Sequence, residues 1–268
     1  MNKIISEIEE YLEADFEKKL FKASVKYLEN KDDLLRLNSF CYSLRELFRH
    51  VFLRLAPDNS VKKCSWYAKE TDNNQPTRKQ RFLFSVQGGL TPEFVLNDLQ
   101  IDVAEYWRDI RDSINTLSKY THVGENTFDI SGSVVDSIAE EALSSLLSIF
   151  HITHDTRVDL HSSLTNHIDK ALIKTLLLKS FSEIDTLSSY SYIESCEVND
   201  WTLSDIDEDT LAFDGEATVY VSLNYGKGED HCELNEEFPF TFSGYSKTDK
   251  PYDLSIPFDE IDIDTESW

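Results

Sequence analysis

The chain has 268 residues and carries 50 acidic against 26 basic side chains, which gives a formal charge of −24 at pH 7. A hydrophobic content of 40% and an aromatic content of 12% supply enough apolar surface for a folded core, so a wholly disordered acidic chain is excluded. The negative charge also argues against a protein that coats nucleic acid with its whole surface, because each phosphate contact requires a cation.

The N-terminal stretch and the cysteines favour a cytoplasmic protein. Acidic residues interrupt the apolar ones near the N-terminus, so we expect no secretory signal there. No apolar run is long enough to predict a membrane span. The cysteines Cys41, Cys64, Cys196 and Cys232 are far apart and form no Cys-x-x-Cys pair, which predicts reduced thiols rather than a disulfide framework.

The charge is unevenly distributed along the chain. Residues 1–150 sum to −5 and residues 151–268 to −19. Within residues 36–81, however, ten Lys and Arg stand against four Asp and Glu. A basic segment in an acidic protein is a candidate nucleic-acid contact.

The first part of the chain has the periodicity of helices. We expect an amphipathic helix at the N-terminus that bends or breaks near Asn30, followed by a helix from Asp32 to Ala56. Thr91 and Pro92 predict another helix start. Further helices are expected over residues 102–119 and from Ser133 to about Phe150.

The second part changes to period-two alternation over residues 192–245, which predicts antiparallel strands. Pro239 lies inside one alternating run and indicates an edge strand. The acidic stretch from Ile256 is either a final edge strand or a tail that docks on a basic partner.

These patterns predict an α+β fold. A helical domain is expected over residues 1–155, with a basic loop at 57–90. An acidic α+β domain is expected over residues 156–268, with a long helix at 161–180, the antiparallel strands at 192–245 and the acidic tail.

The helix around residue 50 carries the strongest candidate for chemistry. At about 100° per residue, one half of this helix is apolar and the other is polar except for Leu53. The polar half presents Arg45, Glu46, Arg49, His50 and Arg54. Arginine suits phosphate oxygens and histidine exchanges protons near neutral pH. The alternative is a solvated helix face with ordinary ion pairs.

Arg45 and His50, with four residues between them, resemble the Arg and His pair of HEPN-type ribonucleases. The resemblance implies that His50 is a general acid or base at the ribose 2′-hydroxyl or the leaving oxygen, and that Arg45 stabilises charge on the phosphate. Glu46 and Arg49 are included in this candidate catalytic set. The resemblance further implies a homodimer with its groove across the twofold axis.

The segment from Leu117 to Val123 is also similar to one found at the end of a helix in HEPN-like domains. The similarity implies that Tyr120 and His122 face Arg45 and His50 across one groove. The alternative is that His122 caps the C-terminus of its helix, where the dipole favours an imidazolium.

Several segments resemble the family of predicted pPIWI-associating nucleases. They cover residues 44–50, 54–58, 62–67 and 76–84, and residues 206–230 look like the small sheet domain that ends such proteins. The resemblance implies a role in prokaryotic defence against phages and plasmids.

The basic segment offers candidates for nucleic-acid binding. Phosphate contacts are expected from Lys62, Lys63, Arg78, Lys79 and Arg81, and Trp66 is a candidate platform for base stacking. The alternative is a polar loop whose positive charges balance the negative charge of the acidic C-terminal part. In that case the acidic part covers the basic segment until a partner or a nucleic acid displaces it.

Metal binding is not expected. Asp205, Asp207, Asp209 and Glu216 have the spacing of a calcium loop, but Thr210 stands where that loop requires glycine. His151, His154, His161 and His167 lie together in the sequence without a nearby cysteine. We therefore expect neither a metal nor a cofactor.

Two functions follow from these features. The first is a metal-independent RNA endonuclease, a toxin-like effector that works with a protein partner in a defence operon and has no membrane association. The second is a non-catalytic acidic adaptor that binds and regulates a basic nuclease or an Argonaute-like partner. In the second case the run through Phe238, Phe240 and Phe242 would offer a free edge for strand addition.

Overall fold

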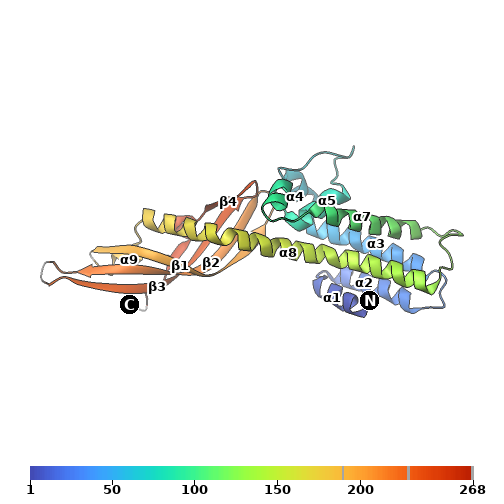
Figure 1. The fold of residues 1–268 in the computed structure, drawn as a ribbon, viewed down its shortest axis with the longest axis horizontal. Helices are drawn as coiled ribbons and strands as arrows, with labels where there is room; N and C mark the ends of the chain where they lie inside the picture. Colours follow the sequence, from blue (N-terminus) through green and yellow to red (C-terminus); the bar gives the residue numbers. More distant parts are fainter. Residues whose placement is uncertain (189, 228–229, 267–268) are drawn as a thin grey trace. The chain divides into compact units, whose positions relative to one another are not determined.

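The computed structural model describes residues 1–188, 190–227 and 230–266 (Figure 1). The chain divides into two compact units, of which the first comprises Met1–Gly88 and Pro92–Thr156 and the second Gly89–Thr91 and Arg157–Trp268. Helices form the first unit and an antiparallel sheet dominates the second. The predicted α+β class, with helices before a sheet, is therefore confirmed.

The helices of the first unit pack around α3. They are α1 (Asn2–Tyr11), α2 (Asp15–Glu29), α3 (Arg36–Leu55), α4 (Asp58–Lys63), α5 (Arg78–Gln87), α6 (Pro92–Asn97), α7 (Val103–Tyr120) and the first part of α8 (Gly132–Leu178). The apolar half of α3 is fully buried at Leu44, Leu47 and Val51, and this helix contacts α2, α5 and α7. The opposite, polar half is thus left for solvent and ligands.

Local signals explain where some helices differ from the prediction. The predicted break near Asn30 is present, because α2 ends at Glu29, but a further break at residues 12–14 separates α1 from α2, and α3 begins at Arg36 rather than Asp32. The expected basic loop at 57–90 contains α4 and α5. Thr77 and Gln80 form a capping box that starts α5, and the buried Phe82 and Phe84 anchor it.

The helix expected at 161–180 is part of α8, one uninterrupted helix of 47 residues. The predicted interruption after Phe150 is therefore wrong. The intervening residues 151–160 contain neither glycine nor proline. The hydroxyls of Thr153 and Thr156 donate to carbonyl oxygens four residues earlier, so these polar residues are accommodated within the helix. Among the described residues, no helix combines the length and the apolar composition that membrane crossing requires.

The second unit is an antiparallel sheet with one face against α8 (Figure 1). Its strands are β1 (Tyr190–Ile206), β2 (Thr210–Tyr225), β3 (Cys232–Lys247), β4 (Lys250–Ser255) and β5 (Ile261–Ile263), with the short helices α9 (Ser182–Asp185) and η2 (Phe258–Glu260). The strand order is β1-β2-β3-β4, and β5 also pairs with β3. Leu164, Ile168 and Leu172 of α8 are buried, as are Val219 and Phe240 of the sheet.

Two glycines make room for aromatic rings between β2 and β3. Gly215 lies opposite Phe242 in the register, and Gly244 lies opposite Phe213. A Cβ atom on either glycine would come within 2.4 Å of the opposing ring. Glycine is therefore required at both positions by packing rather than by backbone conformation.

Pro239 does not mark an edge strand, because β3 lies between β2 and β5. The pairing with β5 ends at Phe240, and the carbonyl of Pro239 accepts a hydrogen bond from the amide of Asp264 at 3.0 Å. In this bond Pro239 acts only as an acceptor, so the N–H that proline lacks is not required. The acidic stretch from Ile256 forms η2 and β5, so the described part of it is a strand rather than a free tail.

Candidate functional site

Four arginines and one glutamate line a single hollow of about 270 Å³ in the helical unit, which we call the arginine pocket. Arg45, Glu46 and Arg49 come from α3, and Arg78 and Arg81 come from α5. The remaining wall is apolar and consists of Phe48, Phe52, Leu53 and Ile114. The structure therefore brings together residues that the sequence analysis had assigned to two separate sets, catalytic and nucleic-acid-binding.

The positions of the α5 arginines follow from local contacts. Arg81 is held by the carbonyl of Ala56 at 2.9 Å and by the carboxylate of Asp58 at 2.6 Å, and its side chain is only 12% exposed. Arg78 lies three residues earlier, in the exposed first turn of α5. Residues three apart share a helix face, so both guanidinium groups reach the same pocket.

Glu46 is the counter-ion of the α3 arginines. Its carboxylate accepts from Arg49 Nε at 2.9 Å and from Arg45 Nη2 at 3.5 Å. The hydrogen bond from Arg49 is the main cause that lowers the pKa of Glu46, with a smaller opposing effect of desolvation. With Glu46 and Asp58 ionised, the four guanidinium groups still leave a surplus of positive charge, as a site for a phosphate-like anion requires.

His50 lies beside the arginine pocket rather than in its wall. Its Nε2 is 2.8 Å from Arg49 Nη2, and its ring packs edge-on against Phe16 with the centroids 4.7 Å apart. A guanidinium group only donates hydrogen bonds, so in this contact Nε2 accepts and carries no proton. Arg49 therefore links the imidazole to the pocket.

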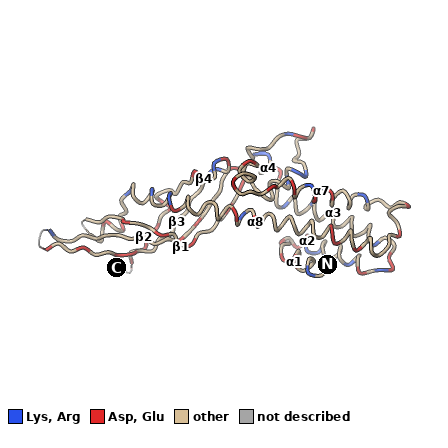
Figure 2. Tube along the Cα trace, in the orientation of Figure 1, with Lys and Arg blue, Asp and Glu red and all other residues tan. Residues whose placement is uncertain are grey.

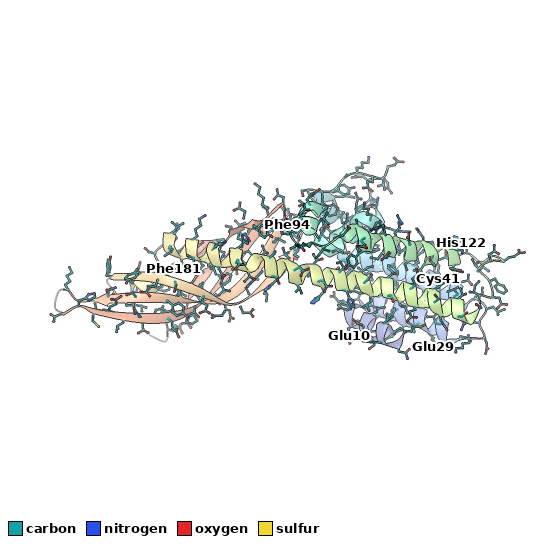
Figure 3. All side chains as sticks on the ribbon, viewed as in Figure 1. Glu10, Glu29, Cys41, Phe94, His122 and Phe181 are labelled. Carbon is teal, nitrogen blue, oxygen red and sulfur yellow. The ribbon has the colours of Figure 1, made fainter. Side chains whose placement is uncertain are left out.

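Tyr120 and His122 lie at the other end of α3. The carbonyl of Tyr120 accepts from Asn38 Nδ2 at 2.9 Å, and the carbonyl of His122 accepts from Thr127 Oγ1 at 2.6 Å. Figure 3 labels His122 where the chain leaves α7. Asn38 precedes Arg45 by seven residues, or about 10 Å along the helix. The structure thus does not bring Tyr120 and His122 to the arginine pocket.

The other candidates of the basic segment have separate positions. Lys62 and Lys63 end α4, and Lys79 is exposed on α5. Trp66 packs against the buried cluster that contains Val61 and Phe84, and its indole donates to the carbonyl of Gly88 at 3.3 Å. Trp66 therefore supports the local core and is only partly accessible for base stacking.

The apolar wall of the pocket was not predicted from the sequence, and Arg54, on the polar half of α3, lies outside the pocket. Leu53, the apolar exception on the polar half of α3, lines the pocket and is 37% exposed. Arg54 instead pairs with Glu17 of α2 at 3.1 Å and with Glu13, which precedes α2, at 3.3 Å. The sequence contains a signal for these ion pairs, because Glu13 and Glu17 are four residues apart and such spacing brings two side chains close together near a helix.

Comparison with known protein families covers both units. Residues 9–146 match a family model described as "Predicted pPIWI-associating nuclease", and residues 153–268 match a second model with the same description. The chain belongs to this family. Searches of the curated proteins and of the solved structures returned no match. The family description indicates a nuclease associated with PIWI-type proteins, which agrees with a role in defence.

The first matched segment of the chain contains the whole arginine pocket. Its histidines outside the pocket make other contacts. His151 Nε2 is 2.8 Å from a carboxylate oxygen of Glu7, His161 stacks on Trp201, and His167 stacks on Tyr252. Within the described part of the chain, no three His, Cys, Asp or Glu side chains are grouped as metal ligands.

Proposed function

We propose that this pPIWI-associating nuclease is a metal-independent RNA endonuclease of a prokaryotic defence system, and that the arginine pocket binds a backbone phosphate. One observation carries the proposal: Arg45, Arg49, Arg78 and Arg81 converge on one hollow beside His50. Guanidinium groups hold phosphate oxygens in a fixed orientation, and a neighbouring imidazole exchanges protons near neutral pH.

The proposed reaction is an internal transfer within the RNA. When the bound phosphate draws the Arg49 guanidinium away from His50, Nε2 is freed and accepts the proton of a ribose 2′-hydroxyl, and the resulting oxygen attacks the adjacent phosphorus. The bond from phosphorus to the 5′-oxygen breaks, and that oxygen takes up the proton that the imidazolium of His50 releases, which restores the neutral imidazole. The products are a 2′,3′-cyclic phosphate and a 5′-hydroxyl end. Arg45 and Arg49 stabilise the negative charge that develops on the phosphate.

The experiment is incubation of the purified full chain with end-labelled RNA, single-stranded DNA and duplex DNA, each with Mg²⁺ and with EDTA. We expect RNA cleavage that persists in EDTA and leaves a cyclic phosphate. His50→Ala should lower the cleavage rate by about 10²- to 10⁴-fold, the usual contribution of a general acid or base. Circular dichroism checks that the variant is folded.

Arg157→Ala is the matched control for arginine variants of the pocket. It removes the same charge from an exposed position in the second unit. Arg45→Ala should lower cleavage strongly and Arg157→Ala should not. Complete inhibition by EDTA, or full activity of the folded His50→Ala variant, would contradict the proposed mechanism.

A further inference from the structure

The long strand β1 forms one edge of the sheet, and the short strands β4 and β5 lie beyond β3 on the other side, so the strand that contains Pro239 is not an edge. Among the described residues, β1 pairs only with β2, although it runs for 17 residues from Tyr190 to Ile206. An edge strand presents a row of backbone N–H and C=O groups that another chain can pair with.

Three register shifts interrupt β1, between Ile193 and Ser195, between Val198 and Asp200, and near its end. Such bulges bend an edge and limit how much of it can accept another strand. Ser195–Val198, between the first two shifts, keeps regular register with β2. Strand addition is therefore confined to a short stretch centred on these four residues.

An apolar groove follows this stretch. Ile173, Leu176 and Leu177 of α8 line a hollow of about 80 Å³ together with residues 193–196 of β1. A second hollow of about 210 Å³ shares Leu176, Leu177 and Ile193 and extends to Phe181 and Ile184. Leu177 is 61% exposed and Ile173 is 41% exposed, so large apolar side chains border the groove on the α8 side.

The charge around the groove restricts its occupant. Lys179 lines the second hollow, but the following residues 180–226 contain eleven Asp and Glu and no Lys or Arg. Figure 2 shows acidic positions along β1 and β2. Glu197 is exposed within the edge stretch, and Glu194 is exposed immediately before it. A second copy of β1 would place like charges opposite one another, which is unfavourable between paired strands.

We propose that Ser195–Val198 binds an extended segment of another protein that alternates apolar residues with Lys or Arg. Successive side chains of a strand point to opposite faces. Cys196 and Val198 are half-buried on the α8 side, whereas Ser195 and Glu197 are exposed. The apolar side chains of the added strand enter the groove beside Leu177, and its cations face the carboxylates of the outer face.

This docking site is independent of the proposed nuclease activity, and a direct binding measurement tests it. The probe is a short fluorescent peptide that alternates Lys and Val, titrated with the full chain and followed by anisotropy. We expect saturable binding, and protection of the Ser195–Val198 amides from hydrogen exchange. A peptide that alternates Glu and Val should not bind, and proline at the centre of the Lys–Val peptide should abolish binding because it removes a ladder hydrogen bond.

Variants of exposed residues distinguish the groove from general charge attraction. Leu177→Asp and Glu197→Lys should each weaken binding by about tenfold or more, as expected for a central contact of an interface. Val158→Asp and Asp159→Lys are the controls, because they make the same changes in charge at exposed α8 positions outside the groove. Absence of binding, equal weakening by the controls, or full binding of the proline peptide would overturn the proposal.

Discussion

At the scale of single residues, Glu46 decides how much of the arginine charge is available to a ligand. It accepts hydrogen bonds from both Arg45 and Arg49. A phosphate that enters the pocket must compete with this carboxylate for the same donors. Glu46 therefore orients the guanidinium groups and at the same time limits the affinity of the pocket for anions.

We predict that Glu46→Gln strengthens binding of inorganic phosphate or a short RNA, because an internal anion is removed. At pH 7 the free energy of unfolding should fall by less than about 1 kcal/mol, the range of partly exposed ion pairs. The folded-state pKa of Glu46 lies below 4.5, so its stabilising contribution is present above that pH and is lost as the pH falls through the folded pKa.

Calorimetric binding and thermal melts between pH 3 and pH 7 measure both effects. The stability difference between the parent and the variant should disappear at the acidic end. Asp15→Asn is the control, since it removes the carboxylate of the exposed pair with Lys19 on α2. Weaker phosphate binding by Glu46→Gln would show that the carboxylate only orients the arginines.

At the scale of elements, α2 and α3 are joined by an ion pair in a largely apolar contact. Arg54 Nε lies 3.1 Å from both carboxylate oxygens of Glu17, whose side chain is 3% exposed. Arg54 Nη2 is buried without a hydrogen-bond partner among the described atoms. The pair thus depends on Arg54, because its removal would leave the buried carboxylate of Glu17 without a counter-ion.

We expect Arg54→Ala to destabilise the chain by about 3–5 kcal/mol, the usual effect of breaking a buried ion pair from one side. The double variant Glu17→Gln, Arg54→Met should recover most of this loss, because it removes both charges and keeps the volume. Chemical denaturation of the parent, the single variant and the double variant provides the comparison. A single variant as stable as the parent would mean that water reaches Glu17.

At the scale of the whole molecule, the charge of −24 limits where nucleic acid can bind. The pocket offers a local surplus of cations, whereas most of the net negative charge, −19 of −24, lies in residues 151–268. The field of the protein therefore discourages contacts outside the pocket. A homodimer stays a prediction of the HEPN resemblance.

We predict a shallow salt dependence for RNA binding. Each phosphate contact with a single strand contributes a slope of about −0.7 in log affinity against log salt, so one or two phosphates in the pocket give about −0.7 to −1.4. Filter binding at several salt concentrations measures the slope, and Arg78→Ala should make it shallower. A much steeper slope would point instead to an extended track through Lys62, Lys63 and Lys79.

The sequence predicts the α3 side of the arginine pocket better than the α5 side. The polar half of α3, with Arg45, Glu46 and Arg49, follows from helical periodicity because neighbouring turns fix which residues share a face. The α5 side was expected as a loop, because Arg78 and Arg81 obscure the apolar residues of a short helix. The capping box of Thr77 and Gln80 was the available signal for α5.

By itself, the sequence determined the helical and sheet parts, the arginine-rich helix face, the uneven charge and the family. These properties depend on local periodicity and composition. Only the tertiary structure decided that Arg78 and Arg81 join Arg45 and Arg49, that Tyr120 and His122 lie elsewhere, and that β1 is an edge of the sheet whereas β3 is not. These outcomes depend on which helices and strands become neighbours, and long-range packing sets those neighbours.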